Sequence, residues 1–306
     1  MTNYPPFIET LEHKRLFKQL SKQPLTYDNF LDDYSYATNE VKTLMDSWRN
    51  GGVPIEKNVL GSKVYYRIAS ETSLEYILRY PTEDYSLMFV SDTHLGCKQC
   101  DLTGLELAYD YAKDLGIKDV LHEGDLCDGI NVYPGQINNL LVWGVDDLVD
   151  YVVEKYPKRN DITTHFITGN HEERVYKQVK VDLGMLINSQ RDDLHYVGRN
   201  FAKAKINDLN FWQVHYQGSV AYSIGYRAQK YLRQKKVTPD FLLLGHAHCV
   251  MYAQIQNTHA FECGTFQGEN DYSISKGLDN QLAFWIVNIN KVDDQTNIKQ
   301  ELITLK

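Results

Sequence analysis

Residues 87–94, with the sequence LMFVSDTH, join a short apolar run to two side chains that bind divalent metals. A short apolar run bounded by turn residues is typical of a buried strand, and Asp92 and His94 follow it at once. The same order recurs at 120–121 before Asp125, 166–167 before Asn170 and His171, 211–214 before His215, and 241–244 before His246 and His248. Since ligands bind outside the carboxyl ends of the strands in α/β sheets, these residues predict one site for two metal ions.

The composition predicts a folded protein with a substantial core. The chain has 306 residues, of which 43% are hydrophobic, enough for one large domain and a small one. The net charge of -8 excludes a surface that attracts nucleic acid or anionic membranes as a whole. Five cysteines is an odd number, and no apolar stretch approaches the roughly 20 residues of a membrane span. We therefore expect a soluble, cytoplasmic protein that does not enter a membrane.

Residues 1–85 form the first of two expected domains. The elements predicted here are a helix from Pro5 to residue 20, a short helix capped by Thr26, a helix over 38–50, and strands over 53–59 and 63–68. Three helices followed by a hairpin resemble a winged helix-turn-helix, a small α+β domain. The segment carries ten Lys plus Arg against twelve Asp plus Glu. Contact with DNA and docking on a protein partner or on the second domain therefore both stay open.

Residues 86–306 form the second expected domain, in which strands alternate with helices. Helices are predicted over 105–115, 140–153 and 221–233, and closing strands over 284–289 and 298–305. This alternation predicts an α/β fold. The connection near 72–84 is not enriched in Gly or Ser, so we expect the two domains to pack together.

Five short blocks in the second domain occur in a recognisable order. The blocks are Asp92-Thr93-His94, Gly124-Asp125-Leu126-Cys127-Asp128, Gly169-Asn170-His171-Glu172, His215, and Gly245-His246-Ala247-His248. Together they resemble the D-x-H, G-D-x-x-D, G-N-H-E, lone H and G-H-x-H blocks of the calcineurin-like metallophosphoesterases, over roughly residues 86–290. One block would be weak evidence because short motifs recur by chance, whereas five in family order are specific. The resemblance implies a four-layer α/β/β/α sandwich.

The resemblance also implies how two divalent ions are held. Asp125 would bridge the ions, with Asp92, His94 and His248 on one of them and Asn170, His215 and His246 on the other. Carboxylate and imidazole ligands suit Mn²⁺, with Fe, Zn, Ni or Mg as alternatives. The neutral amide oxygen of Asn170 keeps the negative charge low, so that the centre stays cationic enough to bind a phosphoryl group.

His171 and Asp128 are the residues expected to act in catalysis. A water shared by two cations loses its proton near neutral pH, and the resulting hydroxide would attack phosphorus in line with the leaving group. His171 cannot easily reach the metal that its neighbour Asn170 binds, so it would protonate the leaving oxygen as a general acid. In family members the second carboxylate of G-D-x-x-D holds this histidine, which makes Asp128 its orienting partner.

The motif details favour a phosphodiester substrate. In the related protein phosphatases the second block continues as D-R-G, but here Gly129 follows Asp128. The D-x-H and G-H-x-H pairing is closer to the nuclease and phosphodiesterase branch, which includes exonucleases of double-strand-break repair. We therefore expect a phosphodiesterase that acts on nucleic acid. A phosphomonoesterase acting on protein or nucleotide, and a non-catalytic nucleic-acid adaptor, remain alternatives. Members of this superfamily often form homodimers, which stays open here.

Five further residues are candidates for contact with the substrate. Tyr222, Tyr226 and Gln229 share one face of a predicted helix, for which core packing is the alternative interpretation. Arg174 and Arg227 are candidate phosphate clamps. The stretch 261–268, FECGTFQG, also resembles stand-alone phosphoesterases from phages and archaea, and we expect it to form a strand and a loop at the rim of the site.

Overall fold

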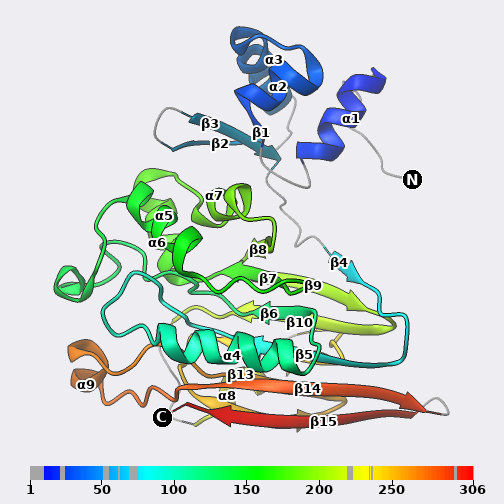
Figure 1. Ribbon diagram of the computed structural model, residues 1–306, viewed down its shortest axis with the longest axis vertical. Helices are drawn as coiled ribbons and strands as arrows, with labels where there is room; N and C mark the ends of the chain where they lie inside the picture. The colour runs from blue at the N-terminus through cyan, green and yellow to red at the C-terminus, as the bar shows by residue number, and fades with distance from the viewer. Residues whose placement is uncertain are drawn as a thin grey trace.

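Two parts make up the protein, a small N-terminal unit and a larger unit built from two stacked sheets (Figure 1). The computed structural model describes residues 10–20, 25–50, 55–60, 63–68, 75–218, 223–233, 235, 237–292 and 295–305. Within these ranges, none of the helices has the length and apolar character needed to cross a bilayer.

The N-terminal unit packs three helices against a small sheet. Its elements are α1 (Leu11–Leu20), β1 (Leu25–Thr26), α2 (Tyr27–Tyr34), α3 (Thr38–Asn50), β2 (Ile55–Leu60) and β3 (Lys63–Ile68). The antiparallel sheet has the order β1-β3-β2. Leu16, Phe30 and Trp48, one from each helix, are buried in one cluster with Tyr66 of β3. The unit thus has an apolar core of its own.

The short helix α2 begins at its predicted cap. Thr26 accepts a hydrogen bond from the backbone N–H of Asn29, and the Asn29 side chain reaches back to the Thr26 N–H, which makes a capping box. The helix α3 and the β2–β3 hairpin are confirmed as well, whereas Pro5, expected to open the first helix, lies outside the described residues. The winged helix-turn-helix interpretation and the domain boundary at residue 85 stay predictions.

The larger unit contains two six-stranded sheets, with the orders β15-β14-β5-β6-β7-β8 and β12-β13-β11-β10-β9-β4. The first is made of β5 (Asp84–Val90), β6 (Asp119–His122), β7 (Thr163–Thr168), β8 (Leu194–Arg199), β14 (Ala283–Val292) and β15 (Gln295–Thr304). The second is made of β4 (Glu75–Leu78), β9 (Phe201–Ile206), β10 (Leu209–His215), β11 (Phe241–Gly245), β12 (Val250–Ile255) and β13 (Thr258–Cys263). Strands β5 to β8 are parallel, as are β10, β11 and β13, so their carboxyl ends meet at common edges.

Helices cover the outer faces of both sheets. On the first sheet lie α4 (Leu102–Asp114), α5 (Val145–Lys155), α6 (Asn170–Val179) and α7 (Leu183–Gln190), on the second lies α8 (Tyr226–Arg233), and the loops hold η1 (Gln136–Asn139) and α9 (Asp271–Lys276). Alternation along β5 directs Met88 and Val90 into the helix-facing cluster, and Leu87 and Phe89 into the cluster between the sheets. The predicted four-layer α/β/β/α sandwich is confirmed.

The helix predicted over 140–153 begins later, at Val145. Gly144 is its N-cap, with an extended backbone at φ −96° and ψ 152°. The apolar residues before it serve another purpose: Leu140 pairs with Cys97, and the Leu141 N–H donates to the carbonyl of Gly96 at 2.8 Å. These two residues therefore fix the loop that follows β5 instead of extending α5.

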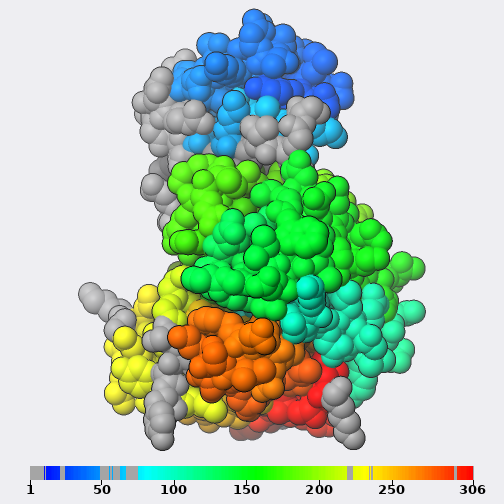
Figure 2. Space-filling model, turned by 90° about the vertical axis from the view of Figure 1, so that its left-hand side faces the viewer, coloured from blue at the N-terminus to red at the C-terminus, as the bar shows by residue number. Residues whose placement is uncertain are grey.

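The N-terminal unit rests on the helices of the first sheet. Tyr65 of β3 belongs to the same buried cluster as residues of α4, α5 and α7. A cleft of about 1030 Å³ between the two parts is lined by polar residues, among them Lys63, Asn188 and Arg191. Figure 2 shows the blue unit seated on the green part of the chain, away from the orange and yellow segments.

Candidate metal centre

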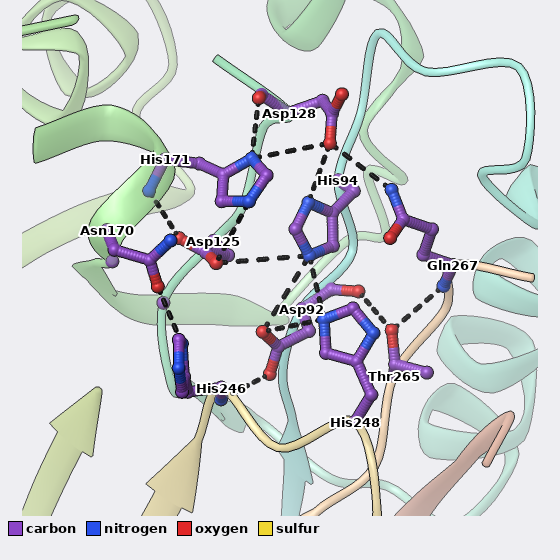
Figure 3. A network of polar contacts seen from close by, with 12 residues as sticks. Asp92, His94, Asp125, Asp128, Asn170, His171, His246, His248, Thr265 and Gln267 are labelled. Carbon is purple, nitrogen blue, oxygen red and sulfur yellow. Dashed lines mark hydrogen bonds and ion pairs between the residues drawn. The ribbon is translucent and has the colours of Figure 1, made fainter. Parts of the chain in front are cut away.

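All seven predicted metal ligands lie where strands of the two sheets end. Asp92 and His94 follow β5, Asp125 follows β6, Asn170 opens α6 directly after β7, His215 closes β10, and His246 and His248 follow β11. Because the sheets face each other, residues far apart in sequence meet in one network of polar contacts (Figure 3).

Asp92, His94 and His248 form the first group of donor atoms. Asp92 Oδ1 lies 3.4 Å from His248 Nε2 and 3.7 Å from His94 Nε2, and the two Nε2 atoms are 3.1 Å apart. Ligands about 2.1 Å from a shared ion lie about 3.0 to 3.4 Å from one another in octahedral or tetrahedral coordination. The three atoms therefore have spacings close to those of one coordination shell.

Asp125, Asn170, His215 and His246 form the second group. Asn170 Oδ1 lies 3.0 Å from His215 Nε2 and 2.6 Å from His246 Nδ1. His246 turns Nδ1 inward because its Nε2 donates to the carbonyl of Gly218 at 2.6 Å. Burial, and then the charge of His215, lower the pKa of His246 to about 4. At neutral pH this ring is uncharged, so Nδ1 presents a lone pair to the centre.

Asp125 lies between the two groups. Its Oδ2 is 3.2 Å from His215 Nε2 in the second group and 3.9 Å from His94 Nε2 in the first. Burial would raise the pKa of Asp125, but the charges of His215 and His171 outweigh it and hold the pKa well below its usual range. The side chain is thus an ionised carboxylate that faces both groups at once.

Hydrogen bonds on the far side of two imidazoles fix which nitrogen faces the centre. His94 Nδ1 is 2.9 Å from Asp128 Oδ1, and His215 Nδ1 is 2.7 Å from the carbonyl of Glu123. Metal-binding histidines usually donate their second ring nitrogen to a carboxylate or carbonyl in this way. Both rings therefore direct Nε2 inward.

Asp92 offers a direct test of whether cations fit this donor set. Its Oδ1 is buried, and no hydrogen bond reaches it from any residue that the structure describes. A buried carboxylate oxygen without a partner is strongly destabilising. A cation bound beside this oxygen would remove that cost. This oxygen, a shared carboxylate and four imidazoles are the donors that a pair of divalent ions requires.

His171 and Asp128 lie together at the edge of the centre (Figure 3). His171 Nδ1 is 2.6 Å from the main-chain carbonyl of Asp128 and 3.4 Å from its Oδ1, while Nε2 is 3.9 Å from Asp125 Oδ2. Burial would lower the pKa of His171, but the Asp125 carboxylate outweighs it, so the pKa lies above its ordinary value. His171 Nε2 therefore faces the centre, in the position from which a general acid would donate its proton.

A comparison with family models identifies the domain that carries this centre. The model of the calcineurin-like phosphoesterase superfamily domain matches residues 86–277, more than half of the chain. The chain belongs to this superfamily. The resemblance of the five sequence blocks is thereby confirmed, and the two donor groups lie inside the matched range.

Individual relatives of this calcineurin-like phosphoesterase are distant. The DNA polymerase II small subunit of Methanothermobacter thermautotrophicus is 23% identical over 240 residues, which cover 62% of this chain and 49% of that protein. The chain thus spans about half the length of this curated relative. Among solved structures, an archaeal phosphodiesterase is 14% identical with a TM-score of 0.42, covering 71% of this chain and 99% of the other. A putative 5′-nucleotidase from Staphylococcus aureus is 12% identical with a TM-score of 0.41, covering 72% and 54%.

Three of the predicted substrate contacts lie on two separate helices of the phosphoesterase domain. Arg174 is exposed on α6 and donates through Nε to the Asn131 carbonyl at 3.3 Å. Tyr226 and Gln229 are exposed on α8, and neither lines the pocket beside His215. Tyr222 lies outside the described residues. Substrate contact by these four residues stays a prediction.

The contacts that two glutamines make with Asp128 were not predicted from the sequence. Gln136 Nε2 donates to the carbonyl of Asp128 at 2.7 Å and to its Oδ2 at 2.9 Å, and Gln267 Nε2 donates to Oδ1 at 3.2 Å. Thr265 Oγ1 donates to the Asp92 carbonyl at 2.8 Å. The stretch 261–268, expected at the rim of the site, thus contributes Thr265 and Gln267 to it. Loop packing also brings in Gln136, and no local pattern indicates that residue.

The backbone is strained at most of the predicted ligands. Positive φ angles occur at Asp92 (51°), His94 (46°), Asp125 (51°), His246 (96°) and His248 (56°). Such conformations cost about 1 to 3 kcal/mol each in non-glycine residues and cluster at functional sites. The strained backbone at these residues therefore lowers the stability of the fold while it positions the side chains.

Gly169 shows how closely the backbone approaches the shared carboxylate. A Cβ at this position would lie 2.2 Å from Asp125 Oδ1 and 2.6 Å from the Asp125 backbone nitrogen. Only glycine fits, which explains why the G-N-H-E block begins with it.

Proposed function

We propose that this chain is a phosphodiesterase that depends on two divalent ions, with Mn²⁺ as the expected metal. The two groups of donor atoms would each hold one ion, and Asp125 would bind both. The position of Asp125 Oδ2, 3.2 Å from His215 Nε2 and 3.9 Å from His94 Nε2, is the observation that carries the proposal. Imidazole and carboxylate ligands suit Mn²⁺, and Fe, Zn, Ni or Mg are the alternatives that metal substitution would test.

Bound ions would supply an acidified water and charge neutralisation at phosphorus. The residues of the chain perform the remaining tasks. His171 would give the proton on Nε2 to the leaving oxygen, while its Nδ1 stays held by the Asp128 carbonyl. Gln136 and Gln267 each donate one hydrogen bond to the Asp128 carboxylate, and Gln136 donates another to the Asp128 main-chain carbonyl, which keeps this residue in place. The general acid is therefore oriented before the substrate arrives.

A nucleic-acid strand is the substrate that we propose. A phosphomonoester carries one more negative charge than a diester, and the related protein phosphatases grip it with the arginine of D-R-G. Here Gly129 follows Asp128 in place of that arginine. The name of the curated relative, a DNA polymerase small subunit, also supports a role at nucleic acid. The N-terminal unit, whose Lys57 and Lys63 are exposed, would add contacts to the strand or to a protein partner.

Turnover of simple esters tests the proposal. With Mn²⁺ we expect bis(p-nitrophenyl) phosphate to be hydrolysed at least about tenfold faster than p-nitrophenyl phosphate, a difference of about 1.4 kcal/mol in barrier. A chelator should abolish both reactions, and labelled single- and double-stranded DNA should be cleaved under the same conditions. Preference for the monoester would contradict the diesterase assignment, and metal uptake without any turnover would favour an adaptor.

Metal binding should release protons and strengthen with pH. Burial would lower the pKa of His215, but the Asp125 carboxylate outweighs it and raises the pKa to about 9. The metal-free ring is therefore protonated at pH 7, and an ion must displace that proton. Affinity should rise by about tenfold per pH unit up to pH 9 for each proton displaced. The stability of the metal-free fold changes with pH in the opposite direction. The stabilisation from protonated His215 is complete below about pH 6.5 and is lost as the pH rises through 9.

Calorimetry in buffers of different ionisation enthalpy measures this proton release. At least one proton per chain should be released at pH 7 in the wild type, and fewer in His215→Asn. His195→Asn, which changes a histidine of β8 outside the donor groups, is the matched control and should behave as the wild type. Metal affinity that does not change between pH 6.5 and 9 would refute the assignment of His215.

A further inference from the structure

A pocket of about 320 Å³ opens beside His215. This volume lies at the small end of the range for ligand pockets, roughly 300 to 1,000 Å³, and suits one small organic group. His171 does not line it and packs against the ring of His94 instead, with ring centroids 4.5 Å apart. In the view of Figure 3, His171 and His246 lie on opposite sides of Asp125. The pocket therefore adjoins the part of the centre that does not hold the general acid.

Two positively charged side chains of α8 line this pocket. Arg227 and Lys230 are three residues apart on the helix and both line the pocket, so they share a face. The guanidinium carbon of Arg227 lies 5.1 Å from the ring centroid of Tyr216, and its Nη2 is 3.8 Å from the position of a Cβ at Gly218. Since the Gly218 carbonyl accepts the hydrogen bond of His246, Arg227 is one contact away from a predicted metal ligand.

The remaining walls combine aromatic rings with an unused hydrogen-bond acceptor. Phe201, Tyr216 and Tyr231 supply the rings. Asn200 also lines the pocket, and its Oδ1 is buried without a hydrogen-bond partner among the described residues. The Asn200 backbone has a φ of 56°, and its carbonyl accepts from the N–H of His215 at 2.9 Å. The side-chain Nδ2 donates to Glu173 Oε2 at 3.3 Å, so the amide is held beside the centre.

A nucleotide matches this combination of groups. Its phosphate suits two neighbouring cations, of which an arginine is the better ligand because of its forked donors. Its base has flat faces that stack on aromatic side chains and N–H groups that an amide oxygen accepts. A simple alkyl or aryl group would contact the rings alone and would not bond to Arg227, Lys230 or the Asn200 oxygen.

We propose that this pocket binds the nucleotide that remains attached to the phosphorus during hydrolysis, while the leaving group departs on the side of His171. This inference rests on the proposed phosphodiesterase function and adds to it the pocket that binds the substrate. Arg227 and Lys230 contact the phosphate or sugar side of that nucleotide, and Tyr231, Phe201 and Asn200 contact its base. The chain is then selective for a nucleic-acid strand over diesters that lack a nucleoside on this arm.

Two esters with the same leaving group test the pocket. Thymidine 5′-(p-nitrophenyl phosphate) and methyl p-nitrophenyl phosphate both release p-nitrophenol, and they differ only in the arm that stays on phosphorus. The wild type should favour the thymidine ester by at least about 100-fold in kcat/KM. Arg227→Gln and Lys230→Gln should each lower this preference by about tenfold, the effect of losing one charge-assisted hydrogen bond. A general loss of activity would lower both rates and leave their ratio unchanged.

Lys113→Gln, at an exposed lysine of α4, is the matched control and should keep the wild-type ratio. Lys230 is itself exposed, so its variant should fold even if Arg227→Gln does not. A wild type without preference, or a Lys230→Gln ratio within twofold of the wild type, would overturn the proposal.

A second measurement separates this inference from the proposed function. If the wild type hydrolyses neither ester with Mn²⁺, the phosphodiesterase proposal fails. Nucleotide binding, measured without hydrolysis, then tests whether the pocket is a nucleotide site. Thymidine 5′-monophosphate should bind to the chelator-treated wild-type chain in calorimetry, and about tenfold more weakly to Lys230→Gln. Equal binding by the two proteins would refute the pocket without any reference to hydrolysis.

Discussion

Replacing Asp125 with Asn is expected to leave at most one metal ion per chain and to lower diester turnover by at least about 1,000-fold. The carboxylate is the only predicted ligand that faces both donor groups, with Oδ2 between His215 and His94. An amide keeps the size and one oxygen but removes the negative charge that a bridge between two cations needs. The loss of one ion also removes charge stabilisation worth several kcal/mol at the transition state.

Metal content by elemental analysis and the rate on bis(p-nitrophenyl) phosphate measure the two effects together. Asp114→Asn changes an exposed carboxylate at the end of α4 and is the matched control, expected to retain both ions and full activity. Thermal unfolding should be recorded for each variant. Two tightly bound ions in Asp125→Asn would contradict the shared position of this side chain.

His171→Asn should separate catalysis from metal binding. We expect metal content to stay at the wild-type level, because His171 belongs to neither of the two donor groups around Asp125, and turnover to fall by about 100- to 10,000-fold, the usual contribution of a general acid. The loss should be largest for a nucleotide whose leaving group is a sugar hydroxyl. It should be smaller for p-nitrophenol, a weaker base that departs with little help from a proton.

This dependence on the leaving group distinguishes a proton donor from a residue that only packs. A structural role would lower the rates on both substrates by the same factor. Asp128→Asn should give a weaker version of the same pattern, because the Asp128 main-chain carbonyl still holds His171 Nδ1 at 2.6 Å. Full activity of His171→Asn on an alkyl leaving group would refute the assignment.

The sequence predicted the layered fold because the strands carry their own markers. Runs such as 87–90 and 241–244 are short, apolar and followed by polar residues, and both became central strands. Helix boundaries were less predictable. The apolar pattern from 140 onward looked continuous with α5, but the backbones of Leu140 and Leu141 bond to the loop after β5 instead of forming a helix. Periodicity of apolar side chains alone cannot show that the helix begins only after these residues.

The site was predictable where each residue follows a strand and unpredictable where it comes from a loop. The seven predicted ligands follow the ends of β5, β6, β7, β10 and β11, so their meeting follows from sheet topology. Gln136 and Gln267 reach Asp128 from η1 and from the loop after β13, and only the packed structure brings them there. Sequence spacing contains no information about that packing.

The rotation of α8 explains why Tyr226 and Gln229 do not line the pocket beside His215. A helical face with Tyr222, Tyr226 and Gln229 is consistent with the sequence. The structure buries Ala228 and Leu232 against the second sheet, which directs Arg227, Lys230 and Tyr231 into the pocket beside His215. In a short helix whose polar residues outnumber its apolar ones, several rotations satisfy the pattern, and contacts with the sheet decide among them.

The strand β4 precedes the expected domain boundary, yet it pairs in parallel with β9 at the end of the second sheet. A shortened protein that starts at residue 86 would leave the N–H and C=O groups of Phe201–Ile206 open along one side, and would remove Tyr76, which stacks on His165 and bonds Gln213. Uncovered strands of this kind recruit further chains. If such a truncated phosphoesterase aggregates, the cause would be the loss of β4 from the edge of the second sheet. Aggregation would therefore not show that the two sheets and their helices are unable to fold.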